Sequence, residues 1–144
     1  NRPMFDSGSA VVKPYMRDIL HAIGAALSDV DTSISLAGHT DATPYTNGER
    51  SYSNWELSAD RANAARRELI AAGMPESKLA RVVGLAASDL LEPDNPRAPL
   101  NRRITITVLT HEAEERLLRK SAVIVPAAEL AAQKSENPAS AARP

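Results

Sequence analysis

The segment Thr32–Ala72, TSISLAGHTDATPYTNGERSYSNWELSADRANAARRELIAA, contains the features that predict the fold of this 144-residue chain. Its first residues, Ser33–Gly38, alternate between apolar and small polar side chains, which is the pattern of a strand with one buried face. A polar loop follows over Ala42–Glu56, and beyond it small and apolar residues recur at helical spacing as far as Ala72. The segment therefore predicts a strand, a long loop and a helix in succession.

The expected boundaries of this helix make Arg61 unusual. Ser58 is a good N-cap, and Gly73 followed by Pro75 is a typical helix end. A helix that begins at Ser58 places Arg61 in its first turn, where a cation meets the positive end of the helix dipole at a cost of about 0.3–1 kcal/mol. Two interpretations remain open: Arg61 pairs with a structural carboxylate, or it binds the anion of a ligand.

Asp41 directly follows the strand and is the candidate partner of Arg61, although an aspartate at this place can also be a simple turn former. An amino-acid end carries a carboxylate and an ammonium a few ångströms apart. A guanidinium fork suits the carboxylate, and an aspartate suits the ammonium. We therefore predict that Asp41 and Arg61 face each other across a shallow site that captures a zwitterionic amino-acid end rather than performing chemistry.

The remaining elements follow from the same patterns. Pro14 begins an amphipathic helix that extends to about residue 28. Strands are expected at Leu79–Leu85 and Arg103–Val108, and a charged helix at His111–Lys120. Strands separated by helices predict an α+β fold, namely a two-layer α/β sandwich in which helices pack on one face of a mixed sheet.

We divide the chain into four parts. They are an N-terminal extended segment with the first strand (1–13), the core domain (14–110), a C-terminal helical extension (111–132) and a disordered tail (133–144). No apolar run approaches the roughly 20 residues that cross a bilayer. Because the chain begins with Asn1 rather than Met, we expect a piece of a longer protein from which any targeting or membrane segment is missing.

Composition argues against several classes of function. The net charge of -1 gives no electrostatic footprint for nucleic acid, and the absence of cysteine excludes disulfides and thiolate chemistry. The three histidines have no metal-ligand spacing, and no nucleophile or phosphate-binding motif is present. We expect no catalytic residue, metal or cofactor. The alternative is an enzyme in which His39 beside Asp41 acts as a base.

Four motifs occur in a recognisable order over residues 4–109. They are Phe5–Ala10, Gly38–Asp41, Asn54 with Leu57–Ala62, and Asn101–Ile104. Together they resemble the OmpA-like peptidoglycan-binding domain. The run Ser53–Ala62 is similar in particular to the wall-binding subunit of flagellar motor stators.

The resemblance implies a pocket for the diaminopimelate of the peptidoglycan stem peptide. Asp41 would bind the ammonium of this residue and Arg61 its carboxylate. The resemblance also implies further site residues around these two: Thr40, Asn54, Leu57 and Ser58 in the pocket, and at its rim Asn101 with Arg102 or Arg103. The loop over Ala42–Glu56 is longer than in many relatives, and its aromatic residues are expected to regulate access.

The resemblance further implies a wall anchor of the proton-driven stator, a homodimer that works with the channel subunit MotA through a transmembrane part missing from this sequence. It would be the periplasmic domain of a single-span inner-membrane protein in a Gram-negative bacterium. The alternative within the same family is an outer-membrane or lipoprotein wall linker that has no motor role.

Overall fold

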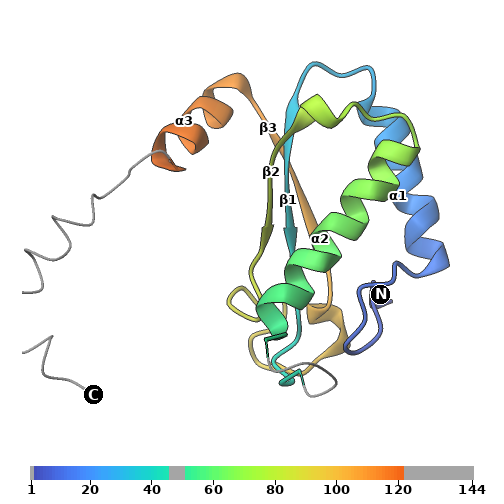
Figure 1. Cartoon of the computed structure of the whole chain (residues 1–144), viewed down its shortest axis with the longest axis vertical. Coiled ribbons are helices and arrows are strands. Elements are labelled where there is room, and N and C mark those ends of the chain that lie inside the picture. Colours follow the sequence, from blue (N-terminus) through green and yellow to red (C-terminus); the bar gives the residue numbers. More distant parts are fainter. Residues whose placement is uncertain (1, 46–50, 122–144) are drawn as a thin grey trace, which may run out of the picture. The chain divides into compact units, whose positions relative to one another are not determined.

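The computed structural model in Figure 1 describes residues 2–45 and 51–121 of the chain. The chain divides into two compact units, Asn1–His111 and Glu112–Pro144, each described by itself. The elements are α1 (Pro14–Leu27), β1 (Ser33–Gly38), α2 (Asn54–Ala71), the 3₁₀ turn η1 (Glu76–Lys78), β2 (Leu79–Gly84), the 3₁₀ turn η2 (Pro99–Asn101), β3 (Ile104–Leu109) and α3 (His111–Ser121). Each predicted helix and strand from α1 to α3 is present, and the predicted α+β class is confirmed.

The three strands form one mixed sheet with β1 in the centre, because β1 runs parallel to β2 and antiparallel to β3. Leu36 in β1 lies opposite Val82 on one side and Ile106 on the other. Figure 1 shows α1 and α2 on the same side of this sheet, as expected for a two-layer sandwich. The core lies between the layers and contains Phe5, Val12, Met16, Leu20, Ile34, Leu36, Ala64, Ala65, Leu69, Met74 and Ile104.

Small residues allow α2 to lie very close to the central strand. A Cβ atom added to Gly38 would come within 1.9 Å of the backbone oxygen of Ser58, so only glycine fits there. On the helix, Ala62 and Ala65 face the sheet and are fully buried. This close approach places Arg61 directly beside the end of β1, and it is therefore what assembles the candidate site.

The predicted start of α2 at Ser58 is wrong. The helix begins at Asn54, with Ser53 as N-cap: the Ser53 hydroxyl accepts from the backbone, and the Glu56 carboxylate accepts from the Ser53 amide at 2.7 Å. This reciprocal capping box satisfies two amide donors that a start at Ser58 would leave unexplained. Arg61 consequently lies beyond the first turn, and the expected penalty from the helix dipole does not apply.

The predicted strand within residues 1–13 is also wrong for the residues described, 2–13. The backbone carbonyls of this segment bond to arginine side chains instead of a neighbouring strand. Arg102 donates to the oxygen of Phe5, and Arg61 donates to the oxygens of Asp6 and Ser9. Since these bonds satisfy the backbone acceptors without a ladder, the segment stays irregular. Phe5 itself is 1% exposed and anchors the segment to the core.

The ends of the other elements agree with the sequence. Gly73 follows α2 with a φ of +108°, the left-handed conformation expected of a residue that ends a helix. α3 occupies the position predicted for the charged helix. Within the described residues, no helix is both long and apolar enough to cross a membrane. The tail at 133–144 and the end of the C-terminal extension lie outside the described residues.

Candidate functional site

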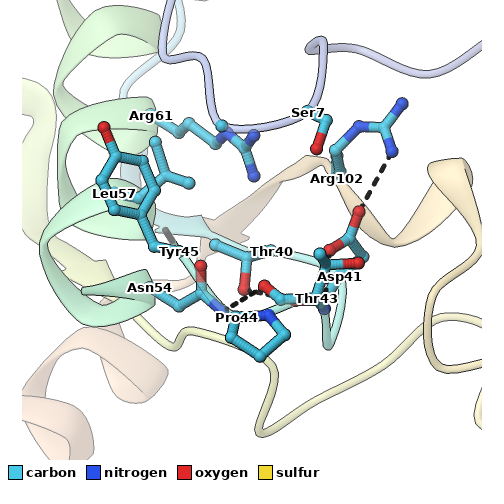
Figure 2. Close-up of a pocket in the computed structure, with 11 residues that line it drawn as sticks. Ser7, Thr40, Asp41, Thr43, Pro44, Tyr45, Asn54, Leu57, Arg61 and Arg102 are labelled. Carbon is cyan, nitrogen blue, oxygen red and sulfur yellow. Dashed lines mark hydrogen bonds and ion pairs between the residues drawn. The ribbon is translucent and has the colours of Figure 1, made fainter. Parts of the chain in front are cut away.

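A small pocket lies where four parts of the chain meet (Figure 2). They are the N-terminal turn, the loop after β1, the first half of α2 and Arg102, which lies between η2 and β3. Its volume is about 80 Å³. The residues that line it are Ser7, Gly8, Thr40, Asp41, Thr43, Pro44, Tyr45, Asn54, Leu57, Arg61 and Arg102. The structure therefore brings together six of the nine predicted site residues.

Asp41 is held in a fixed position at the edge of this pocket. The residue is 5% exposed. Its Oδ1 accepts a hydrogen bond from the Thr43 amide at 2.9 Å, and its Oδ2 pairs with the Arg102 Nη1 at 3.0 Å. The ion-pair partner of Asp41 is thus Arg102 and not Arg61, contrary to the direct pairing considered from the sequence. A carboxylate has about four acceptor sites, so Asp41 retains capacity for a further cationic donor.

Arg61 lies on the inner wall of the pocket and is fully buried at 0% exposure. Three backbone oxygens accept from its guanidinium: Nε donates to Ser9 at 2.8 Å, Nη1 to His39 at 3.0 Å and Nη2 to Asp6 at 3.0 Å. The Phe5 ring lies 5.0 Å from the guanidinium carbon, a cation–π contact. These contacts fix the position of the group and use three of its five N–H donors, which leaves two.

Among the described residues, no carboxylate forms an ion pair with Arg61. Burial, with a contribution from the nearby Arg102, lowers the pKa of Arg61 to about 10, and the charge of Asp41 acts in the opposite direction. At neutral pH the group therefore remains protonated. No ion pair joins Arg61 to an acidic side chain in the part of the chain that the structure describes; Asp41 pairs with Arg102. A buried cation without a counter-charge is costly, and an anionic ligand would relieve that cost.

Three predicted site residues do not line the pocket. Ser58 is fully buried in α2, where its hydroxyl donates to the Trp55 oxygen at 2.9 Å and accepts from the Ala86 amide at 3.0 Å. Asn101 is also fully buried. Arg103 approaches Asp89 at 4.0 Å.

Asn101 supports the site indirectly. Its side-chain oxygen accepts from the Glu92 amide at 2.8 Å, and its side-chain nitrogen donates to the oxygens of Asn95 and Pro96. These bonds fix the turn that precedes Arg102. Asn101 therefore holds the backbone beside the pocket and does not line the pocket itself. The sequence pattern could not distinguish this structural role from contact with a ligand.

Five lining residues are not among the nine predicted site residues, although the aromatic residues of the loop, Tyr45 included, were expected to regulate access. Ser7 and Gly8 belong to the Phe5–Ala10 motif, but nothing local indicates that this motif folds over α2. Thr43 could have been predicted from the sequence, because an aspartate commonly accepts a hydrogen bond from the backbone amide two residues later in an Asx turn, as Asp41 does from Thr43. Pro44 and Tyr45 follow directly along the same loop.

The aromatic residues of the loop are only partly at the pocket. Tyr45 lines it and packs against Tyr52 with the two rings tilted by 57° and their centroids 4.7 Å apart, whereas Trp55 is 56% exposed and does not line it. Residues 46–50 lie outside the described part of the chain. Regulation of access by this loop therefore stays a prediction.

His39 does not form a catalytic pair with Asp41 in this arrangement. It is 1% exposed, does not line the pocket, and its Nε2 lies 3.0 Å from the Thr105 hydroxyl. Burial, together with the positive charge of Arg103, lowers the pKa of His39 to about 4. The side chain is thus a neutral imidazole at physiological pH, packed against the sheet behind the site.

The depressed pKa of His39 predicts a pH-dependent stability. Between pH 6.5 and 4 the unfolded chain binds a proton at this residue that the folded chain does not bind. The contribution of His39 to the free energy of unfolding should therefore have its full value above pH 6.5. It should fall as the pH is lowered to 4, by up to about 3 kcal/mol. Urea titrations of the parent and of His39→Gln across this range measure the difference. Parallel pH curves for the two proteins would refute the assignment.

Comparison with known proteins identifies the family of the chain. The model of the OmpA family matches residues 4–104, and the chain belongs to the OmpA family. Motility protein B of Escherichia coli K12 is 55% identical over 122 residues, which cover 85% of this chain and 40% of that protein. The chain thus spans less than half the length of this relative.

Solved structures show the same fold. The periplasmic domain of Helicobacter pylori MotB (residues 97–256) superposes with a TM-score of 0.65 at 21% identity, covering 84% of this chain and 88% of that one. The cell wall anchor of the type VI secretion system (T6SS) from Pseudomonas aeruginosa gives a TM-score of 0.61 at 28% identity, covering 75% and 76%. The resemblance predicted from the four ordered motifs is confirmed.

Proposed function

We propose that this chain is a non-catalytic anchor to the cell wall, which binds the peptidoglycan stem peptide in the pocket of Figure 2. The observation that carries this proposal is the buried, positively charged Arg61, which has no carboxylate partner among the described residues and shares a pocket with Asp41. A cation that pairs with no described acidic side chain, beside a fixed carboxylate, matches a ligand end that carries both charges.

The ligand group is the diaminopimelate of the stem peptide. Its free end presents an ammonium to the open acceptor sites of Asp41 and a carboxylate to the remaining donors of Arg61. Thr40, Asn54 and Leu57 bound the space around this end. Binding requires no bond to break, so the site needs neither a base nor a metal.

The identity with Motility protein B supports a role in the flagellar motor stator. The chain would then be the periplasmic domain of a single-span inner-membrane protein of a Gram-negative bacterium, would form a homodimer, and would work with MotA. A stator can exert torque on a rotor only if it is fixed to something immobile. Two copies in a dimer would hold the wall more firmly than one, because the second binding event occurs at high effective concentration.

Co-sedimentation with purified peptidoglycan tests the proposal. The chain should pellet with walls that contain diaminopimelate and remain largely soluble with walls that contain lysine at this position, since lysine lacks the second carboxylate. No soluble muropeptides should appear. Equal sedimentation with both walls, or release of muropeptides, would contradict the proposal.

The motor role needs a separate test, because the similarity to a secretion-system wall anchor supports a wall linker without a motor function. A chimera that joins this chain to the membrane part of Motility protein B should restore swimming to cells that lack that protein. A chimera that binds walls but never supports swimming would favour the wall linker.

A further inference from the structure

The side chains that line the pocket carry an excess of one positive charge. Asp41 is the single carboxylate among the lining residues in the described part of the chain, whereas Arg61 and Arg102 both contribute guanidinium groups. The nearby Asp6 does not line the pocket and pairs with Lys13 at 2.6 Å. A ligand end with one ammonium and one carboxylate would leave this excess charge uncompensated.

The two arginines lie at different depths. Arg61 is fully buried, whereas the Arg102 side chain is 13% exposed. Arg102 is held by two bonds: Nε donates to the Phe5 oxygen at 2.7 Å, and Nη1 donates to the Asp41 Oδ2 at 3.0 Å, the contact drawn in Figure 2. Its Nη2 has no acceptor among the described residues, so the two donors of Nη2 and the second donor of Nη1 remain available at the rim.

We propose that the pocket selects a peptide end that carries one ammonium and two carboxylates, with Arg102 binding the second carboxylate. This inference rests on the proposed function and narrows its ligand. The preferred stem peptide ends at diaminopimelate, so that the main-chain carboxyl of this residue is free. Stem peptides that continue beyond diaminopimelate, or in which its main-chain carboxyl is an amide, bind more weakly.

The depth of the two arginines decides which carboxylate each one binds. The pocket, at about 80 Å³, has room for an end group but not for the peptide that carries it. The ammonium and its neighbouring carboxylate therefore enter and meet Asp41 and Arg61. The main-chain carboxylate stays at the rim, where Arg102 lies. Because two bonds already fix Arg102, binding costs it little side-chain entropy.

Three synthetic stem tripeptides test the selectivity by isothermal titration calorimetry of the 144-residue chain. One has both diaminopimelate carboxyls free, one has an amide at the main-chain carboxyl, and one has an amide at the side-chain carboxyl. The diacid should bind at least about tenfold more tightly than either amide, because each amide loses a charge-assisted hydrogen bond.

The variant Arg102→Gln separates ligand binding from a structural role. It should bind the diacid and the main-chain amide equally, while it still discriminates against the side-chain amide. A loss of the same factor for all three peptides would show that Arg102 only supports the pocket, and would overturn the inference. Arg67→Gln removes an equal charge at an exposed position of α2 and should keep the full preference of the parent.

The outcomes also distinguish this inference from the proposed function. If the parent binds the diacid and the main-chain amide with equal affinity and still sediments with walls, the selectivity is wrong and the wall anchor stands. If no tripeptide binds and the chain does not sediment with walls, both are wrong.

Discussion

Replacing Asp41 with Asn is expected to abolish wall binding while the fold is retained. Asn keeps an oxygen that can accept from the Thr43 amide, so the turn after β1 should be preserved. It removes the negative charge that the ligand ammonium requires, and loss of one partner from a buried charge pair costs about 2–5 kcal/mol. We therefore expect the affinity for stem peptide to fall at least about 30-fold, measured by titration calorimetry and by co-sedimentation.

This variant should also lose some stability. Asn at position 41 leaves Arg102 without its ion-pair partner in a contact where the two side chains are only 13% and 7% exposed, although Arg102 keeps its bond to Phe5. The free energy of unfolding should fall by about 1–3 kcal/mol, the cost of a buried polar group that loses its partner. Asp89→Asn is the matched control, since Asp89 is 71% exposed and pairs only distantly with Arg103. If Asp41→Asn binds walls as well as this control does, Asp41 does not bind the ligand ammonium as proposed.

Replacing Arg61 with Met is expected to affect binding and stability together. Met has a similar length without the charge or the donors. The backbone oxygens of Asp6, Ser9 and His39 each lose a donor, and an unsatisfied buried acceptor costs about 1–3 kcal/mol. Packing of the apolar side chain offsets part of this loss, so we expect the free energy of unfolding to fall by about 2–4 kcal/mol. Urea unfolding measures this quantity.

The same variant should lose wall binding even where it is fully folded. Binding is therefore compared at a temperature at which circular dichroism shows the native spectrum. Arg67→Met, at an exposed position of the same helix, is the control for a change of charge and should match the parent in both measurements. An Arg61→Met protein that binds walls normally would contradict the ligand role. One that unfolds like the parent would contradict the structural role.

Periodicity in the sequence was sufficient for most of the fold. The alternation in Ser33–Gly38 and the helical spacing after Pro14 are local consequences of burying one face, and both elements lie where they were predicted. The start of α2 was misplaced because Ser53 and Ser58 are both good N-caps. The capping box between Ser53 and Glu56 is the stronger signal, and it decides the boundary.

The site was predictable only in part, because its decisive contacts join residues that are far apart in the sequence. Asp41 and Arg61 could be placed near one another from a strand, a loop and a helix in succession. Nothing in that segment indicates that the Phe5–Ser9 backbone, more than fifty residues before Arg61, supplies its acceptors. For the same reason the partner of Asp41 was expected on α2 and is found just before β3.

A crystal structure of the chain with diaminopimelate bound would test most directly whether one pocket holds both charges of the ligand. We predict the ammonium within hydrogen-bond distance of an Asp41 carboxylate oxygen and a carboxylate within hydrogen-bond distance of the Arg61 guanidinium. Diaminopimelate bound elsewhere on the domain, or bound in this pocket with Arg61 contacting only backbone oxygens, would contradict the account.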